Sequence, residues 1–140
     1  MYPSVKDNKD YTSIVNDAQH ARLQGLIDDA AKQGAVITQL SSDRGCAKTR
    51  QMPLTLLQGV NDDMKVMQQE IFGPLLPIHE YDTLDQAIEY INKGERPLAL
   101  YIYSFNKACQ EKILKSTMNT DCIRHTKLVK NTIKKVAVCG

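Results

Sequence analysis

The sequence has no long apolar run and no repeat. None of its apolar stretches approaches the ~20 residues that a membrane-spanning helix requires. The opening residues, "MYPSVKDNKDY", are polar and lack the apolar centre of a secretory signal. No internal repeat or low-complexity segment is found. We therefore expect a cytoplasmic protein that makes no membrane contact.

Paired cysteines are also missing. The four cysteines, Cys46, Cys109, Cys122 and Cys139, lie far apart and form no Cys-x-x-Cys motif. Without a secretory signal, this distribution favours reduced thiols over a disulfide framework. Cys122 and His125 have a Cys-x-x-His spacing, but a structural zinc site usually needs four ligands, and only Cys139 lies nearby. We expect no metal.

A strong net charge is absent as well. The chain of 140 residues carries 18 Lys and Arg against 16 Asp and Glu, a formal charge of +2. That charge is too small to argue for nucleic acid or a membrane surface. Lysines gather only in the segment 126–140, for which the sequence leaves a basic amphipathic helix and a frayed end open. Because no aromatic residue is interleaved with these lysines, we interpret them as a solvated face.

What is present is enough apolar material for one domain, with helices and strands in alternation. Three helices are predicted from apolar residues that recur at helical spacing. Their predicted N-caps are Asn16, Asp82 or Thr83, and Asn106, and the predicted ends of the first two are Gly34 and Gly94. In the first helix Gln19 is expected to reach back to its cap. Their predicted inward residues are Leu23, Leu26, Ile27, Ala30 and Ala31, then Leu84, Ala87, Ile88 and Ile91, and finally Ala108, Ile113 and Leu114.

Strands are predicted between the helices, at "AVITQL" (35–40), "PLTLLQGV" (53–60), "LLPIHEY" (75–81) and "LALYIYS" (98–104), with a further strand starting at "DCI". The segment 98–104 is almost continuously apolar, which is typical of a parallel strand buried on both faces. The alternation predicts the α/β class, with an open, largely parallel twisted sheet and flanking helices.

One short stretch, "QEIFGP", fits neither a buried strand nor an ordinary loop. It sets the carboxylate of Glu70 beside Ile71 and Phe72, directly before Gly73 and Pro74. A charge and an aromatic ring at a strand-and-turn junction indicate a surface that binds something. From these six residues alone, a structural role is favoured, with Glu70 in a helix cap or an ion pair and Phe72 in the core.

Longer stretches of the sequence favour a binding role over a structural one, because their order and their residues resemble the NAD(P)-dependent aldehyde dehydrogenase superfamily. The stretches are "DYTSIVNDAQHARLQGLIDDA", "MPLTLLQGVNDDMKVMQQEIFGP", "LLPIHEYDTLDQAIEYIN", "RPLALYIYS" and "CQEKILKST". They are most similar to the coniferyl-aldehyde-dehydrogenase-like members. The resemblance implies an extended or disordered N-terminus (1–9), a partial catalytic domain (10–125) and a divergent lysine-rich tail (126–140).

The resemblance also implies a role for the stretch at Glu70. In the family, the Glu before Ile-Phe-Gly-Pro holds the hydroxyls of the nicotinamide ribose, and the Phe packs against the nicotinamide ring. Those positions are Glu70 and Phe72 here. The chemistry is reasonable, because a carboxylate accepts from hydroxyls and a flat apolar ring orients another flat ring. The parent reaction would oxidise an aldehyde to a carboxylate with NAD or NADP.

Other functional segments of the family are not found in these 140 residues. The family's nucleophile lies in a Gly-Gln-x-Cys segment, its general base lies in Glu-Leu-Gly-Gly, and a Rossmann-type domain holds the rest of the cofactor. A thiolate would be favoured at Cys46, between Arg44 and Lys48, and at Cys109 in the first turn of a helix. Neither matches a family residue, so we expect no catalytic residue here, no tight cofactor binding and no activity of this chain by itself.

The end of the resemblance bears on partners. After "KST" the family continues with a Gly-Gly turn and a strand ending in Asn, where this chain has Asn119-Thr120 and Arg124. A sheet cut from a larger domain leaves an unpaired edge and an uncovered apolar face, which favour association. We expect a homo-oligomer, a dimer or higher, or a complementing chain, and no nucleic acid. The alternative is a folded, non-enzymatic remnant or partner-binding module that self-associates.

Overall fold

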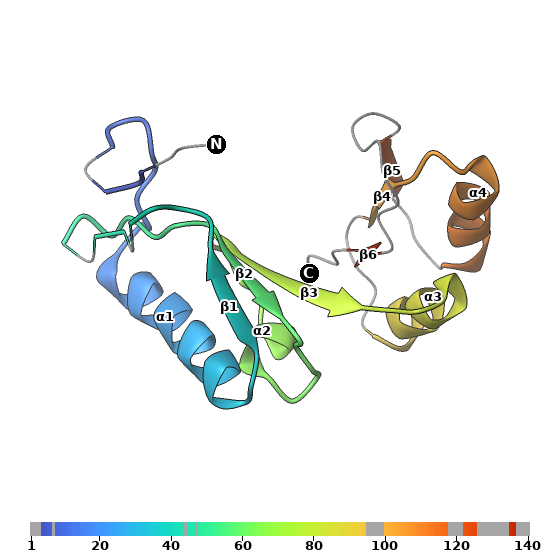
Figure 1. Ribbon diagram of the computed structural model, residues 1–140, viewed down its shortest axis with the longest axis horizontal. Helices are drawn as coiled ribbons and strands as arrows, with labels where there is room; N and C mark the ends of the chain where they lie inside the picture. Colours follow the sequence, from blue (N-terminus) through green and yellow to red (C-terminus); the bar gives the residue numbers. More distant parts are fainter. Residues whose placement is uncertain are drawn as a thin grey trace. The chain divides into compact units, whose positions relative to one another are not determined.

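The structure, a computed structural model, contains two compact units (Figure 1). It describes residues 4–6, 8–43, 45–46, 48–94, 100–117, 122–125 and 135–136. The described residues up to Ile78 form the first unit, and those from His79 onwards form the second. Each unit has its own cluster of buried apolar residues.

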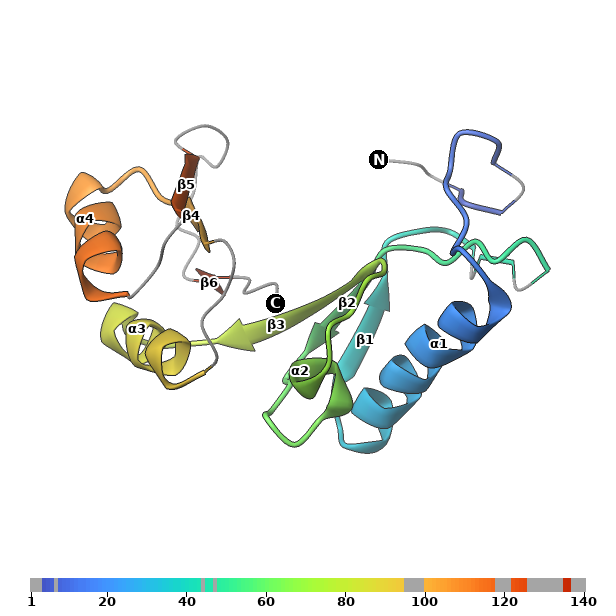
Figure 2. The same cartoon turned by 180° about the vertical axis from the view of Figure 1, so that it is seen from behind.

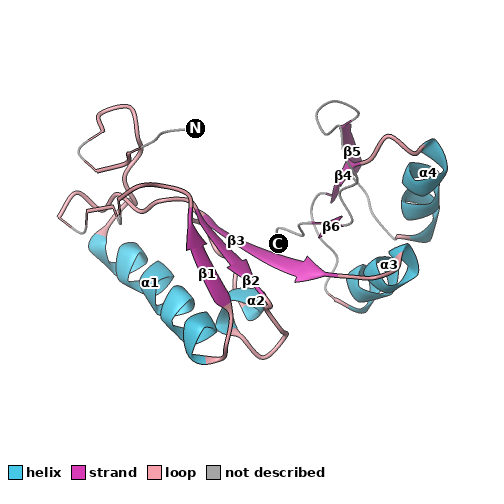
Figure 3. Cartoon of the chain, in the orientation of Figure 1, coloured by secondary structure: helices cyan, strands magenta, loops and turns pink. Residues whose placement is uncertain are grey.

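The first unit packs a long helix against a small sheet. Its elements are α1 (Asp17–Lys32), β1 (Val36–Gln39), β2 (Thr55–Gln58), α2 (Lys65–Gln68) and the start of β3 (Leu75–Glu80). β1 pairs with β2 in antiparallel register and β2 with β3 in parallel register (Figure 3). α1 lies along the sheet in both views (Figures 1 and 2). The core that joins them includes Leu23, Leu26, Ile27, Ala30, Leu57, Met64, Val66 and Leu75.

The boundaries of α1 agree with the sequence prediction. Oδ1 of Asn16 accepts a hydrogen bond of 2.9 Å from the backbone N–H of Gln19, so one of the unpaired amides at the helix start is satisfied. Gly34 follows the helix end with φ +96°, a left-handed value that favours glycine. The predicted apolar stripe is confirmed except at Ala31, which is exposed, because it lies beside the stripe that faces the sheet.

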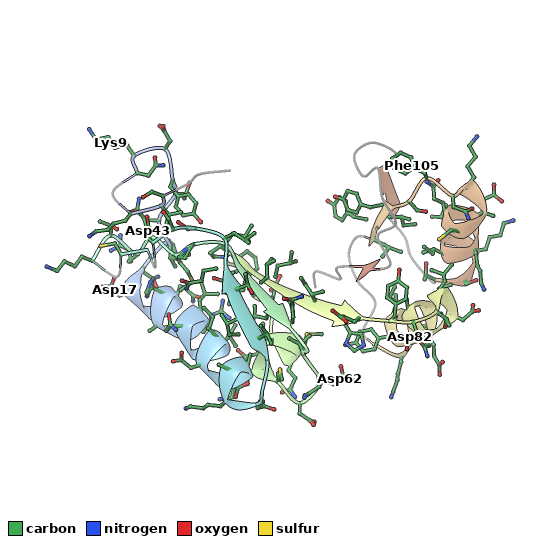
Figure 4. The ribbon with its side chains drawn as sticks, in the orientation of Figure 1. Lys9, Asp17, Asp43, Asp62, Asp82 and Phe105 are labelled. Carbon is green, nitrogen blue, oxygen red and sulfur yellow. The ribbon has the colours of Figure 1, made fainter. Side chains whose placement is uncertain are left out.

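A loop in the first unit binds the segment 4–6. The Asp43 carboxylate accepts from the Ser4 hydroxyl and from the backbone N–H groups of Val5, at 3.1 Å, and Lys6, at 3.3 Å (Figure 4). The Gly45 N–H donates to the other oxygen at 3.1 Å. Together these donors, the Ser4 hydroxyl first, lower the pKa of Asp43 against the opposing effect of desolvation.

The second unit contains the remaining elements. After the end of β3 come α3 (Leu84–Lys93), β4 (Leu100–Tyr103), α4 (Lys107–Ser116), β5 (Cys122–His125) and β6 (Lys135–Val136). β4 pairs with β5 in parallel register, and β6 pairs with the end of β3 in antiparallel register. The core consists of Ile88, Leu100, Ile102 and Ile113. The predicted strand at "DCI" is confirmed as β5.

The helix starts of the second unit are also predicted well. Thr83, rather than Asp82, caps α3, and it forms a capping box with Gln86. Asn106 caps α4 by accepting from the N–H of Cys109 at 3.2 Å. Ala108 is exposed rather than inward, because the buried side of α4 carries Gln110 and Ile113, and Ala108 lies on another side of the helix.

The prediction for the segment 98–104 is partly wrong. Residues 98 and 99 lie outside the described residues, and β4 alternates between buried and exposed positions. Tyr101 is 44% exposed and Tyr103 is 58% exposed, whereas Leu100 and Ile102 are buried. The reason is that, in the described part of the chain, the apolar core with residues of α3 and α4 lies on the Leu100–Ile102 side.

The α/β class is confirmed, with mixed strand directions. Two of the pairings, β2–β3 and β4–β5, are parallel, and two, β1–β2 and β3–β6, are antiparallel. Within the described ranges, no helix has both the length and the apolar character that crossing a membrane would require. Apart from β6, the predicted lysine-rich tail lies outside these ranges.

Candidate functional site

The segment from Glu70 to Pro74 connects the end of α2 to the start of β3 in the first unit. Before it, the Gln69 N–H donates to the Lys65 carbonyl at 3.1 Å and closes the short helix. At its other end, the Pro74 carbonyl accepts from the Thr55 N–H of β2 at 2.8 Å. The segment is therefore fixed at both ends by backbone hydrogen bonds.

The side chain of Arg22, on α1, binds the backbone at the start of this segment. Nη1 donates to the Glu70 carbonyl at 3.1 Å and Nη2 donates to the Ile71 carbonyl at 2.5 Å. The third contact, from Nε to the side-chain oxygen of Gln19 at 2.8 Å, holds the guanidinium against its own helix. Gln19 was predicted to reach back to the helix cap, and its side-chain oxygen is instead engaged with Arg22.

Gly73 packs against the next residue of the same helix. A Cβ added to Gly73 would lie 2.5 and 2.6 Å from Cδ1 and Cδ2 of Leu23, which is fully buried. No ordinary side chain fits at that distance, so glycine allows the segment to approach α1 closely. Ile71 packs against the same core.

Between these two attachments, Phe72 projects outward. Its backbone has φ +46°, in the left-handed region that bulky residues rarely adopt. Its side chain is 80% exposed, which excludes the role of a core residue within the described part of the chain. A strained backbone that exposes a large apolar ring is more typical of a binding site than of a stabilising contact.

Glu70 lies two residues before Phe72 and is also exposed. Its backbone carbonyl is bound by Arg22, but within the described residues no ion pair or hydrogen bond of its carboxylate is found. The two residues that the sequence predicts as a site therefore lie together on one exposed turn. Both the carboxylate and the ring are accessible to a ligand.

Two hollows on the surface border residues of interest, one beside Pro74 and one beside His79. The first, of about 340 Å³, is in the first unit and is lined in part by Tyr11, Ile14 and Pro74, so it borders the end of the Glu70–Pro74 segment. The second, of about 300 Å³, is in the second unit, where the His79 ring stacks on Tyr90 with 4.3 Å between ring centroids. There, Nδ1 of His79 is buried and has no hydrogen-bond partner within the described residues.

The cysteines do not form a comparable site. Cys46 is half-buried in a loop, where its backbone pairs with that of Gln51 in an isolated antiparallel β-bridge. Arg44, close to it in the sequence, lies outside the described residues. Cys109 is a half-buried free thiol in the first turn of α4. Cys122 lies in β5, and Cys139 is not among the described residues. In the described ranges, no three potential ligands come together for a metal ion.

Comparison with known proteins decides the family. The sequence model of the aldehyde dehydrogenase family matches residues 2–129. This chain belongs to the aldehyde dehydrogenase family. The resemblance inferred from the five sequence stretches is thereby confirmed, and so is the α/β fold that it implied.

Individual aldehyde dehydrogenases agree with this assignment. The chain is 47% identical over 117 residues to a "Probable coniferyl aldehyde dehydrogenase" of Pseudomonas aeruginosa, covering 84% of this chain and 24% of that protein. It is 35% identical over 137 residues to "Aldehyde dehydrogenase, dimeric NADP-preferring" of Rattus norvegicus, covering 97% of this chain and 28% of that protein. The fold matches the substrate-bound state of AldH of Staphylococcus aureus with a TM-score of 0.71 and 34% identity, covering 85% of this chain and 25% of that one.

The chain thus spans about a quarter of the length of the aldehyde dehydrogenases that it matches.

Arg22 is the site residue that sequence reasoning missed. It lies inside a quoted stretch of the resemblance, but its partners are backbone carbonyls 48 and 49 residues further along. Because every residue has a backbone carbonyl, no residue type at either end signals the contact.

Proposed function

We propose that Glu70 and Phe72 contact the nicotinamide end of NAD or NADP in an enzyme that oxidises aldehydes to carboxylates. The observation that carries this proposal is the exposed turn itself. Phe72 is held outward in a left-handed conformation, and the Glu70 carboxylate lies accessible beside it. The family membership supports a nicotinamide cofactor, and one relative is named as NADP-preferring.

The two side chains fit the chemistry of that ligand. An ionised carboxylate has only acceptor sites, so it suits the two adjacent hydroxyls of a ribose, each of which donates. An exposed phenyl ring offers an apolar face on which another flat ring can lie. When bound, the nicotinamide ring supplies the hydride acceptor. The role of Glu70 and Phe72 is to bind and orient, and no proton transfer is assigned to either.

The proposal for the chain by itself is more limited. The 140 residues contain two contacts for the nicotinamide end, whereas the adenosine, the pyrophosphate and the nucleophile would require other segments. Binding costs the cofactor the same translational and rotational freedom whether it meets two contacts or many, so we expect this chain to bind it weakly. Without the nucleophile, we expect no dehydrogenase activity. A cytoplasmic location remains a prediction.

Nuclear magnetic resonance (NMR) titration tests the binding proposal. The ¹⁵N-labelled chain is titrated with nicotinamide mononucleotide, with adenosine monophosphate as the control for binding through phosphate. We expect non-saturating shifts at residues 70–73 with the nicotinamide compound only. The shifts should shrink in Glu70→Gln and in Phe72→Ala. Shifts confined to other residues, or none at 70–73 at the highest concentration, would contradict the proposal.

Activity is tested with the purified chain, aromatic and aliphatic aldehydes, and NAD or NADP, alongside a cysteine-alkylated sample. We expect no NADH or NADPH to form in either sample. Cofactor reduction that alkylation abolishes would show that one of the four cysteines is a nucleophile, which contradicts the assignment of no catalytic residue to this chain.

A second proposal is that the chain self-associates. Tyr101, Tyr103 and Phe105 are 44%, 58% and 62% exposed, at alternate positions along and just after β4. Figure 4 labels Phe105 at the loop between β4 and α4. Exposed apolar surface of this kind favours association, and the rat relative is named as dimeric. Light scattering over a concentration series should show a dimer or higher species. A monomer at every concentration would refute this proposal.

A further inference from the structure

We infer that Arg22 is the positioning residue of the cofactor-contact turn, by which we mean residues 70–74. It acts through the backbone of residues 70 and 71 rather than through a ligand. This inference rests on the proposed function for its purpose. Its geometry, however, stands on contacts within the first unit alone. The juxtaposition that carries it is a guanidinium on α1 facing two consecutive carbonyls at the start of the turn.

Two consecutive carbonyls bound by one guanidinium impose a curved backbone. In an extended strand, successive carbonyls point in opposite directions, so a single planar group on one side reaches only alternate ones. Here the Glu70 and Ile71 carbonyls both reach Arg22, at 3.1 and 2.5 Å. The fork of the guanidinium is rigid and planar, so it fixes both peptide planes at once.

The second of these planes leads directly into Phe72. The Ile71 carbonyl belongs to the peptide bond whose nitrogen is that of Phe72, so Arg22 fixes one side of the bond about which φ rotates. The other side is fixed at Gly73, which lies against Leu23. Neighbouring residues of α1 therefore hold the chain immediately before and after Phe72. Between them, the backbone takes the unfavourable φ of +46° and the ring points outward.

The guanidinium is itself well placed for this task. Arg22 is half-buried, and its Nε is bound to Gln19 one turn earlier in the helix at 2.8 Å. This contact limits rotation of the side chain and holds the two outer nitrogens toward the turn. A lysine at this position would offer one ammonium on a flexible chain and would not hold two carbonyls in one plane.

A purely stabilising arginine would behave differently. If Arg22 only adds stability, its loss lowers the unfolding midpoint and leaves Phe72 as it is in every molecule that remains folded. If Arg22 positions the turn, its loss changes the backbone conformation of Phe72 in the folded protein. The conformation of residue 72 therefore separates the two roles.

The test uses NMR of the 140-residue chain without ligand, comparing Arg22→Gln with Arg50→Gln. Arg50 is a matched control, because it lies in the same unit and its Nε also donates to a backbone carbonyl, that of Ile14, at 3.0 Å. In the wild type and in Arg50→Gln, Phe72 should show the strong intraresidue amide-to-Hα contact of a left-handed residue. In Arg22→Gln, that signal should be lost.

An unchanged Phe72 signal in folded Arg22→Gln would overturn the inference. If Arg22→Gln does not fold, Arg22→Lys is measured instead, and it should also lose the signal. Unfolding of both variants would overturn the inference too, because it would make Arg22 a general stabiliser of the first unit.

The same samples separate this inference from the proposed function. When nicotinamide mononucleotide is added, Arg22→Gln should show shifts at residues 70–73 that are several-fold smaller than those of the wild type and of Arg50→Gln. If the wild type itself shows none there, the proposed function fails. The ligand-free measurement on Phe72 still decides the role of Arg22.

Discussion

Replacing Gly73 with alanine tests how closely the cofactor-contact turn is packed against α1. The new Cβ would lie 2.5 and 2.6 Å from the two Cδ atoms of Leu23 and 3.1 Å from its Cγ. The backbone of Gly73 is not in the left-handed region, so alanine introduces no left-handed strain there. The destabilising part of the effect therefore comes from the contact with Leu23.

The expected size follows from the burial of Leu23. Its side chain is fully buried among the core residues of the first unit, so it has little room to move aside. Overpacking of this kind typically costs about 1–3 kcal/mol of the free energy of unfolding. With a urea dependence of about 2 kcal/mol per molar, the unfolding midpoint should fall by about 0.5–1.5 M while the slope stays unchanged.

A double-mutant cycle with Leu23→Ala isolates the contact. Leu23→Ala alone should cost about 2–5 kcal/mol, because it removes a fully buried leucine. It also removes the three atoms that the new Cβ would meet, so Gly73→Ala should cost little in that background. We expect an interaction energy of about 1 kcal/mol or more between the two positions. The assay is urea unfolding by circular dichroism, with backbone amide exchange in the first unit as a second readout.

Additive effects would refute this reasoning. If Gly73→Ala costs the same with leucine or alanine at position 23, within about 0.5 kcal/mol, its cost does not come from Leu23. A negligible cost in the wild-type background would show that the turn is free to move away from α1.

Further predictions concern the helix start of α3 and the Asp43 loop. Thr83→Ala should lower the free energy of unfolding by about 0.5–2 kcal/mol, because it removes the hydroxyl that accepts from the Gln86 N–H; Thr83→Ser should retain most of the stability in urea unfolding. Because the pKa of Asp43 is lowered in the folded protein, the ionised carboxylate stabilises the fold at pH values above the ordinary carboxyl pKa. This stabilisation is lost as the pH falls through the lowered pKa. NMR should therefore show the amides of Val5 and Lys6 leaving Asp43 at a pH below the ordinary carboxyl pKa, and Asp43→Asn should lack this step.

Sequence reasoning predicted the local features best. Asn16, Thr83 and Asn106 each cap a helix through a backbone amide three residues further along, so the signal and its partner lie in one short window. The exposed positions of Ala31 and Ala108 were not predictable in this way. Alanine is common on both faces of a helix, and its burial depends on which elements pack nearby.

The candidate site was predictable in its ligand-facing residues but not in its support. Glu70 and Phe72 were predicted because a charge and an aromatic ring meet at a strand-and-turn junction, and because the family resemblance then gave them a role. Arg22 and Gly73 support the turn through contacts with backbone atoms and with a distant helix. Such contacts depend on tertiary structure, which residue types in one stretch do not encode.

The attachments of the turn have a consequence for the order in which the protein is made. Arg22, Leu23 and Thr55, which hold residues 70–74, all precede the turn in the chain, and all belong to the first unit. Ribosomes add about 5–20 residues per second and domains generally fold from the N-terminus onwards. The residues that make these contacts are therefore synthesised seconds before the second unit is complete, and a nascent chain can present Phe72 before β5 exists.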